Sequence, residues 1–384
     1  MLKKIDSNES IQELCLENEK IYLYGAGNYG ITTRNFLKKF YGVDISGFLV
    51  SDDVDIVDSH VEGVEVKHLS TCNRNSILAV TVSEQHQKEL LDNACSLGFA
   101  HIYVLLNEFH RYMLSELRED RLKPLEKLNF EVHITEHCNL NCKGCYHFSP
   151  LSKPDFLLVE EFDRDLKQMA DLCGERVLAI TLLGGEPLLH PEIVSFFETV
   201  RRYFPNCKVD LLTNGILLKT MKEFFWDSCV KYNITICCTK YPVIVNWDYV
   251  EKKASEFGLK IEYHNDVGAG DKTLIKYPFD LTGQHDVEWN YKHCTRSNKC
   301  ITLKHGRLYT CPMAAHAHLA KDFFNLKMMK LSEEDYIDIY KAKDFEEITE
   351  FLTRPIPFCG YCNLKIKPEQ VEWQKSQQRL DEWF

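Results

Sequence analysis

Short apolar runs alternate with amphipathic segments through the first hundred residues. Four of the runs are bounded by polar residues or glycine, as buried strands are, and two longer segments repeat apolar side chains at helical spacing. The predicted strands are 20–25, 44–52, 76–82 and 101–106, and the predicted helices are 28–40 and 84–99. Because strands and helices alternate, this part of the chain is predicted to form a small parallel α/β sheet.

The same alternation resumes near residue 129. Five apolar runs, each followed by a helical or loop segment, are predicted as strands at 130–135, 177–185, 208–215, 233–242 and 259–266, with room for a sixth around 270–290. A complete eight-stranded barrel typically needs about 250 residues, so this length suits a partial parallel barrel better.

The pattern changes between and after these two blocks. A polar helical stretch separates them, and from about residue 291 turns, short strands and cysteines precede acidic helices near 333–353. The predicted divisions are 1–106, a helical linker at 107–128, 129–290 and 291–384.

Composition narrows the class of protein. The 384 residues are 45% hydrophobic and 27% charged, as in globular proteins with a substantial core. The 46 basic and 57 acidic residues give a formal net charge of −11, which argues against nucleic acid or an anionic membrane as the main partner. No apolar run approaches the roughly 18–20 residues of a membrane span, and no apolar segment follows the N-terminal lysines. We therefore expect a cytoplasmic protein.

Sixteen cysteines are many for a cytoplasmic protein, in which reduced thiols do not form a disulfide framework. Eight of them fall in three tight groups, at 138–145, 294–311 and 359–362, whereas the others are scattered, mostly in apolar stretches. Closely grouped thiols are what a metal site requires, so we expect metal chemistry at these groups.

The first group is a C-x3-C-x2-C motif formed by Cys138, Cys142 and Cys145, directly after the predicted strand 130–135. Three thiolates can bind three irons of a cubane cluster and leave the fourth iron open for another ligand. A structural zinc site is the alternative, but zinc prefers four ligands, and the next histidine, His147, lies only two residues beyond Cys145. The motif alone favours an iron–sulfur cluster and leaves zinc open.

A second motif ends the next predicted strand, with the sequence Gly184-Gly185-Glu186-Pro187. The glycines let the backbone approach a ligand closely, and Glu186 offers a carboxylate. Together the two motifs resemble the radical S-adenosylmethionine (radical SAM) superfamily. The resemblance implies that the three cysteines hold a four-iron four-sulfur cluster, that S-adenosylmethionine chelates the open iron, and that the Gly-Gly-Glu segment contacts its amino group.

Three further positions follow from this resemblance. Asn214, after the third strand of this block, either faces the cofactor or makes the turn, and Thr239 resembles the hydroxyl residue that contacts the ribose of S-adenosylmethionine. A strand-end threonine without a ligand is the alternative for Thr239. Many family members carry an aromatic residue just before the third cysteine, where this chain has Gly144 and places Tyr146 after the cysteine instead.

The remaining grouped cysteines are Cys294, Cys300, Cys311, Cys359 and Cys362. A predicted hairpin turns five positions before Cys311, and a C-x2-C pair follows. This pattern resembles the twitch domain, a shortened SPASM extension of radical SAM enzymes, and implies an auxiliary four-iron four-sulfur cluster. The spacing fits best when the four ligands are Cys294, Cys311, Cys359 and Cys362. Cys300 either replaces Cys294 or lies beside the cluster as a structural thiol. A four-cysteine zinc site is the alternative.

Near the N-terminus, Gly25, Gly27 and Gly30 form a G-x-G-x-x-G motif between a predicted strand and a predicted helix. Such glycines permit a tight turn and bring a phosphate close to the helix N-terminus. Asp52 ends the next strand, where a ribose-binding carboxylate is expected. The segment resembles small Rossmann-like modules attached to sugar-modifying and cell-surface polysaccharide enzymes, and the motif leaves open whether it binds a nucleotide.

The resemblances together imply a fold and an activity. The expected fold class is α/β, with a Rossmann-like sheet, a central partial (β/α)6 radical SAM barrel and a cysteine-rich twitch-like extension. The expected enzyme cleaves S-adenosylmethionine reductively and abstracts a hydrogen atom from a small-molecule substrate, which we expect to be a sugar, polyol or nucleotide-linked sugar. A flavodoxin- or ferredoxin-type protein would supply electrons. A peptide-modifying enzyme and a non-catalytic iron–sulfur assembly or sensor protein are the alternatives.

An alcohol oxidation would also need a base near the barrel mouth. The candidates lie at strand ends or in the following loops, and none stands out: His147, Lys240, Tyr241, His264, Asp266 and Arg296. His316 and His318 follow Cys311, and we expect them at the surface because the pattern shows no carboxylate partner for either.

Overall fold

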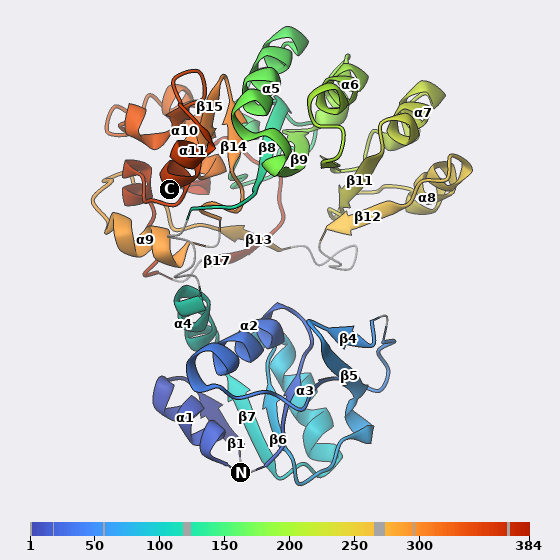
Figure 1. The fold of residues 1–384 in the computed structure, drawn as a ribbon, viewed down its shortest axis with the longest axis vertical. Helices are drawn as coiled ribbons and strands as arrows, with labels where there is room; N and C mark the ends of the chain where they lie inside the picture. Colours follow the sequence, from blue (N-terminus) through green and yellow to red (C-terminus); the bar gives the residue numbers. More distant parts are fainter. Residues whose placement is uncertain are drawn as a thin grey trace. The chain divides into compact units, whose positions relative to one another are not determined.

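The computed structural model describes residues 2–17, 19–56, 58–117, 124–264, 273–294, 296–366 and 369–384. The chain forms two compact units, Met1–Asp120 and Arg121–Phe384 (Figure 1). Both are built on sheets dominated by parallel strands, which confirms the predicted α/β class.

The first unit contains a seven-stranded sheet in the order β1-β7-β6-β2-β3-β5-β4. All neighbouring strands are parallel except the β4–β5 hairpin. The strands are β1 Leu2–Ile5, β2 Ile21–Tyr24, β3 Gly47–Val50, β4 His60–Val61, β5 Val64–His68, β6 Ile77–Val80 and β7 His101–Leu105. The four strands predicted here are β2, β3, β6 and β7, whereas β1, β4 and β5 escaped prediction because they are short and carry few buried side chains.

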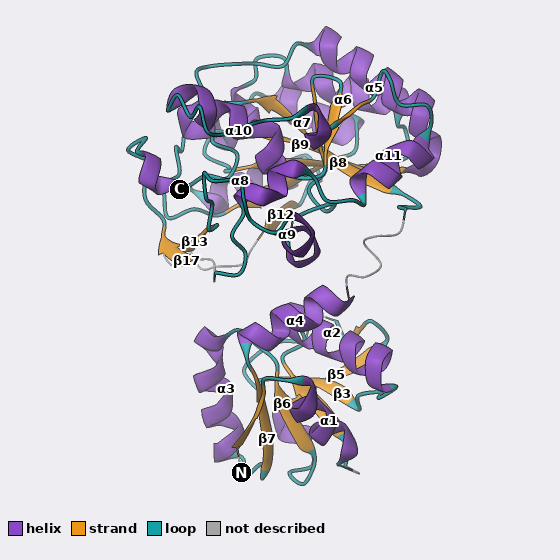
Figure 2. Ribbon diagram, turned by 90° about the vertical axis from the view of Figure 1, so that its left-hand side faces the viewer, coloured by secondary structure: helices purple, strands orange, loops and turns teal. Residues whose placement is uncertain are grey.

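Helices cover both faces of this sheet, as Figure 2 shows. They are α1 Asn8–Leu16, α2 Asn28–Phe36, α3 Glu84–Ser96 and α4 Asn107–Leu117. Apolar side chains of α1, α2 and α4 share one core with the sheet, and those of α3 share a second core. The alternating strands are almost fully buried for this reason, since a parallel sheet must be covered on both faces. The stretch expected as a linker thus begins with α4, a helix of the first unit.

The glycine motif forms the turn between β2 and α2. Gly25 has φ +121°, and a Cβ there would lie 2.7 Å from the carbonyl oxygen of Thr81. A Cβ on Gly30 would lie 2.0 Å from the carbonyl oxygen of Gly25, so the first turn of α2 packs directly against the end of the strand. Gly27, which precedes α2, has no atom within 4 Å of the corresponding position. Only Gly25 and Gly30 are therefore required by packing.

The second unit contains an eight-stranded sheet in the order β12-β11-β10-β9-β8-β14-β15-β16. Its first five strands in sequence are parallel: β8 Leu128–Thr135, β9 Val177–Gly184, β10 Lys208–Thr213, β11 Ile234–Thr239 and β12 Ile261–His264. The connecting helices, which lie along one side of the sheet in Figure 1, are α5 Val159–Cys173, α6 Ile193–Tyr203, α7 Glu223–Lys231 and α8 Trp247–Glu256. This is a partial barrel with its helices outside.

Side chains alternate along β8 between the two faces of the sheet. Phe130, Val132 and Ile134 join the apolar core that contains the outer helices. Glu131 and His133 therefore face the opposite, inner side, where buried polar groups gather.

The sixth parallel strand differs from the expected position. The segment near 270–290 contains β13 Thr273–Lys276, which pairs antiparallel with β17 Glu369–Glu372 in a separate two-stranded sheet. Instead β14 Thr302–Lys304 lies parallel to β8, on the other edge of the five strands. A parallel neighbour can come from any part of the chain, so local pattern did not identify it.

The C-terminal segment continues the same sheet. The remaining elements are α9 Val287–His293, β15 Arg307–Tyr309, α10 Pro312–Phe323, β16 Ile337–Asp338 and α11 Phe345–Leu352. The predicted hairpin with Gly306 in its turn is the β14–β15 pair. Within the described part of the chain, no helix is long and apolar enough to cross a membrane.

The glycine turn yields a direct test. Gly30→Ala should destabilise the β2–α2 region by about 2 kcal/mol, because the added methyl group collides with backbone that cannot rotate away. Hydrogen exchange of the amides in β2 and α2, followed by mass spectrometry on the full chain, measures this loss. Gly27→Ala is the matched control and should leave exchange unchanged; equal exchange in the two variants would contradict the packing argument.

Candidate functional site

The cysteine loop directly follows β8, where the carboxyl ends of the parallel strands meet. The backbone N–H of Leu140 donates to Sγ of Cys138 at 3.4 Å. Tyr241, after β11, lies near all three thiols, and its burial together with these neighbours raises the pKa of its hydroxyl. The structure thus brings Cys138, Cys142 and Cys145 around one position.

The glycines of the second motif join this loop to β9. Gly184 and Gly185 lie so close to the end of β8 that a Cβ on them would stand 2.1 Å from the Thr135 oxygen and 2.0 Å from the His137 oxygen. The N–H of Gly185 donates to the Thr135 oxygen at 2.9 Å, and the N–H of Glu186 to the His137 oxygen at 3.0 Å. Side chains at these glycines would displace the cysteine loop.

Glu186 is fully buried. Its carboxylate accepts hydrogen bonds from the Thr213 hydroxyl at 2.6 Å, from the Asn214 N–H at 2.9 Å and from the Leu188 N–H at 3.1 Å. Burial raises the pKa of Glu186 to about 7. The carboxylate connects the ends of β9 and β10, and Pro187 opens the short turn that follows β9.

Asn214 takes part both in its turn and in the cysteine loop. Its Oδ1 accepts from the Ile216 N–H at 3.0 Å, whereas its Nδ2 donates to Oδ1 of Asn139 at 2.8 Å and lies 3.9 Å from Sγ of Cys138. The turn role is therefore present in the structure, and the same side chain also reaches the cysteine loop. Thr239 ends β11 on the same edge of the sheet and is half-buried.

Sequence reasoning missed a third component of the site, the end of the chain. Residues 373–384, here called the C-terminal strap, run along the cysteine loop. The indole N–H of Trp373 donates to Sγ of Cys142 at 3.0 Å, and the Lys143 N–H donates to the Gln374 oxygen at 2.8 Å. Two tryptophans in the last twelve residues were the available signal.

The strap also explains the departure at Gly144. The indole N–H of Trp383 donates to the Cys145 oxygen at 2.8 Å, and the Glu382 oxygen lies 3.0 Å from where a Cβ on Gly144 would stand. Gly144 also has φ +65°, a conformation that favours glycine. An aromatic side chain at this position would collide with the strap.

The donor set at this loop consists of three thiols, which can bind three irons of a cubane cluster and leave the fourth iron open. His147, which a zinc site would need as a fourth ligand, packs edge-on against the ring of His133 at 4.5 Å between centroids. Among the described residues, no three thiol sulfurs lie within 4.8 Å of one another, whereas sulfurs around one zinc ion lie about 3.8 Å apart.

The C-terminal cysteines gather around Cys362. Burial and the neighbouring thiols of Cys311, Cys294 and Cys359 raise the pKa of Cys362. These four residues come from the end of α9, the start of α10 and the turn Pro357–Tyr361 with the residue after it. The neighbours of Cys300 are Glu131, Arg296 and Cys294, so it lies toward the inner side of the barrel. The grouping favours Cys294 as the fourth ligand.

In the first unit, the side chain of Asp52 is engaged with protein groups. Its Oδ1 accepts from the Ser70 N–H at 3.1 Å and from the Ser70 hydroxyl, which lowers the pKa of the carboxylate. Asp52 thereby connects the end of β3 to the turn after β5.

The candidate bases have different surroundings. The Lys240 ammonium lies over the Tyr263 ring at 3.8 Å, and the Arg296 guanidinium lies over the Tyr146 ring at 3.8 Å. The side chain of His264 and all of Asp266 lie outside the described residues.

The prediction that His316 lies at the surface is wrong. His316 is fully buried in α10, and its Nδ1 lies 2.9 Å from Oε2 of Glu136, a carboxylate partner distant in sequence. His318 is half-buried. Glu136 follows β8, so only the tertiary fold brings the two groups together.

A family comparison agrees with this geometry. The model of the radical SAM superfamily matches residues 132–236, from β8 into β11. Residues 132–236 form a radical SAM domain. Domains of this superfamily use a four-iron four-sulfur cluster and S-adenosylmethionine, and the three thiols beside the glycine backbone fit this pair of cofactors.

Curated relatives match about a third of this chain. A GTP 3′,8-cyclase of Aliarcobacter butzleri is 31% identical over 144 residues, which are 34% of this chain and 44% of the relative. A probable GTP 3′,8-cyclase of Pyrococcus abyssi is 29% identical over 141 residues, 35% of this chain and 44% of the relative. The chain thus spans less than half the length of these relatives.

Solved structures match the chain at lower sequence identity. BtrN in complex with AdoMet and 2-DOIA is 17% identical, with a TM-score of 0.39 and coverage of 62% of this chain and 94% of that chain. Native anSMEcpe with bound AdoMet is 13% identical, with a TM-score of 0.40 and coverage of 62% and 84%.

The strap predicts a redox effect. The hydrogen bond from Trp373 to the Cys142 thiolate would stabilise the more negative, reduced form of a cluster bound there. Trp373→Phe removes this bond, so the reduction potential of the cluster should fall by up to about 60 mV. Trp383→Phe is the control, because it removes an N–H that bonds to a carbonyl oxygen. Redox titration followed by electron paramagnetic resonance, using the signal that S-adenosylmethionine perturbs, measures both. An equal shift in the two variants would contradict a thiolate-specific effect.

The grouping around Cys362 predicts different outcomes for two neighbouring thiols. Cys294→Ala should lower the iron content of the anaerobically reconstituted protein by about four irons per chain, whereas Cys300→Ala should leave it unchanged. Iron and sulfide analysis measures this difference. The reverse pattern would assign the ligand to Cys300.

Proposed function

We propose that this protein is a radical SAM enzyme that abstracts a hydrogen atom from a C–H bond of a small-molecule substrate. The observation that carries the proposal is the contact between the cysteine loop and the glycine motif at the ends of β8 and β9. Three thiols surround one position there, and the glycines bring bare backbone beside them. This combination supports joint binding of a cluster and of an amino-acid headgroup.

Cys138, Cys142 and Cys145 would hold the four-iron four-sulfur cluster, which would supply the electron for reductive cleavage of S-adenosylmethionine and hence the means to remove a hydrogen atom from the substrate. The protein's contribution is orientation and exclusion of water. Glu186 holds the ends of β9 and β10 together, and Asn214 holds the cysteine loop through Asn139. The C-terminal strap covers the loop from the other side.

We propose a sugar, a polyol or a nucleotide-linked sugar as the substrate. The N-terminal module supports this choice, since Gly27 leaves open space at the start of α2, where a phosphate would meet helix N–H groups. Binding of a nucleotide by this module is part of the proposal. The Asp52 carboxylate would have to exchange Ser70 for a ribose hydroxyl.

The cysteines around Cys362 support an auxiliary four-iron four-sulfur cluster. Such a cluster could accept an electron from the substrate radical, which would make the net reaction an oxidation. A flavodoxin- or ferredoxin-type donor in the cytoplasm would supply the first electron.

A peptide substrate is the second candidate. Cysteine-rich extensions of this kind resemble those of peptide-modifying family members, and this resemblance is what favours it. Turnover of a nucleotide sugar without turnover of any peptide would support the sugar substrate over the peptide substrate.

The activity is tested by S-adenosylmethionine cleavage. The anaerobically reconstituted, dithionite-reduced protein should release methionine and 5′-deoxyadenosine, whereas the variant with Cys138, Cys142 and Cys145 changed to alanine should release neither. Its iron content should fall from about eight to about four per chain. Cys72→Ala, a buried thiol of the first unit, is the control and should behave like the natural protein. A preparation with a full first cluster that cleaves no S-adenosylmethionine would exclude the enzyme and favour a sensor or assembly role.

A further inference from the structure

Three histidines meet on the inner side of the barrel. His133 comes from β8, His147 from the end of the cysteine loop and His316 from α10. The ring of His133 stacks on that of His316 with 3.8 Å between centroids and meets the ring of His147 edge-on at 4.5 Å. All three are buried.

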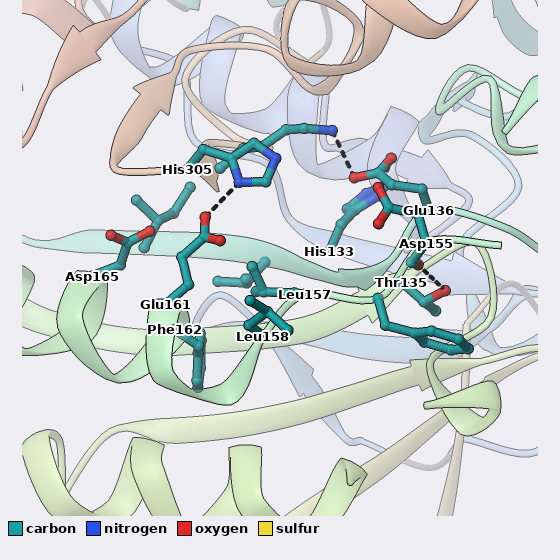
Figure 3. Close-up of a pocket in the computed structure, with 14 residues that line it drawn as sticks. His133, Thr135, Glu136, Asp155, Leu157, Leu158, Glu161, Phe162, Asp165 and His305 are labelled. Atoms are coloured by element: carbon teal, nitrogen blue, oxygen red, sulfur yellow. Dashed lines mark hydrogen bonds and ion pairs between the residues drawn. The ribbon is translucent and has the colours of Figure 1, made fainter. Parts of the chain in front are cut away.

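Glu136 completes this cluster. Its Oε2 lies 2.9 Å from Nδ1 of His316 and 3.9 Å from Nδ1 of His133, while its Oε1 bonds to the Lys304 ammonium at 2.6 Å. Figure 3 shows His133 beside Glu136 and the bond that Glu136 makes on its other side. One carboxylate oxygen is thus held by lysine, and the other faces two imidazoles.

The imidazoles have unused nitrogen atoms. Both ring nitrogens of His133 and Nε2 of His316 are buried without a hydrogen-bond partner among the described residues. The side chains of His133 and His316 are only 1% and 0% exposed. Leaving such groups unsatisfied costs about 1–3 kcal/mol each, so a ligand on the His133 imidazole is expected. His316 meets Glu136 through Nδ1, so its Nε2 does not take part in this cluster.

Burial keeps these imidazoles neutral. Burial and the nearby His316 and His147 hold the pKa of His133 well below its usual value, and burial also lowers the pKa of His316. A neutral imidazole offers a lone pair, which is the form that binds metal ions.

We propose that His133, Glu136 and His316 bind a divalent transition-metal ion, separate from the iron–sulfur sites. The three ligand atoms lie within 4.8 Å of one another. Ligand atoms that bind one ion with bonds of about 2.1 Å lie about 3.0–3.4 Å from one another. Oε2 of Glu136 lies 2.9 Å from Nδ1 of His316 and 3.9 Å from Nδ1 of His133, so the observed distances bracket this range. Small side-chain movements therefore suffice to close the site.

The donor chemistry defines the class of ion. Two imidazoles and one carboxylate suit Zn²⁺, Fe²⁺, Co²⁺ or Mn²⁺, and three protein ligands leave a position for water or an oxygen of another ligand. An ion on Nδ1 of His316 displaces the Lys304 ammonium, now 3.1 Å from that atom, while Lys304 keeps its bond to Oε1. Lys304 then orients the ligand carboxylate from outside the coordination sphere.

A pocket lies against part of this cluster. Its volume is about 210 Å³, and His133, Glu136 and Lys304 form part of its lining together with residues of α5 (Figure 3). The lining also includes Glu161 and His305, which are joined by a hydrogen bond.

Zinc binding by the protein with both clusters in place tests the site. Equilibrium dialysis against Zn²⁺, followed by zinc and iron analysis, should give one zinc per chain with unchanged iron. X-ray absorption should show only nitrogen and oxygen neighbours at about 2.0–2.2 Å, without the sulfur neighbours at about 2.3 Å that binding to a cysteine site would give.

Variants assign the ligands. His133→Asn and His316→Gln should each weaken zinc binding by about 100-fold or more while the iron content stays constant, which reports an intact barrel. His305→Asn is the matched control, because it removes an imidazole that lines the same pocket but is not one of the proposed ligands. The backbone of His305 has φ +48°, a conformation that asparagine tolerates. Absence of bound zinc in the natural protein, sulfur neighbours, or equal zinc binding by His133→Asn and His305→Asn would each overturn the proposal. S-adenosylmethionine cleavage is measured separately, so its outcome does not affect this result.

Discussion

The buried carboxylate of Glu186 is the interaction on which the site depends. It accepts hydrogen bonds from the Thr213 hydroxyl and from two backbone N–H groups, and so connects the ends of two neighbouring strands. From β9 the backbone of Gly185 reaches the end of β8, and from β10 the side chain of Asn214 reaches the cysteine loop. The thiols are thus positioned by a network whose centre is one fully buried carboxyl group, which is costly to bury unless its hydrogen bonds are satisfied.

The end of the chain completes this arrangement. The C-terminal strap pairs with the cysteine loop through backbone hydrogen bonds and places two indole N–H groups on it, one on a sulfur and one on a carbonyl oxygen. The radical SAM domain, residues 132–236, is therefore incomplete without residues far beyond its own limits. The β14–β15 hairpin makes the same point, because it extends the barrel sheet from the C-terminal segment.

The inner side of the barrel combines groups that have no relation in sequence. Glu136 meets His316 and Lys304 because α10 and β14 pack beside β8. The expectation that His316 is a surface residue followed from the lack of a carboxylate partner for it in the sequence pattern. Burial of this imidazole depends on which helix covers the barrel edge, and local periodicity contains no such information.

The sequence by itself determined the alternating α/β pattern, the cysteine loop after the first barrel strand, the glycine motif after the second and the turn at Gly306. Each is a local signal, since strands, turns and closely spaced thiols depend on neighbouring residues. Only the tertiary structure decided that β14 is the sixth parallel strand, that Cys294 rather than Cys300 lies with Cys362, and that a glycine precedes Cys145 because the strap lies against it. These features depend on contacts between distant segments, where packing and the burial of polar groups select the partner.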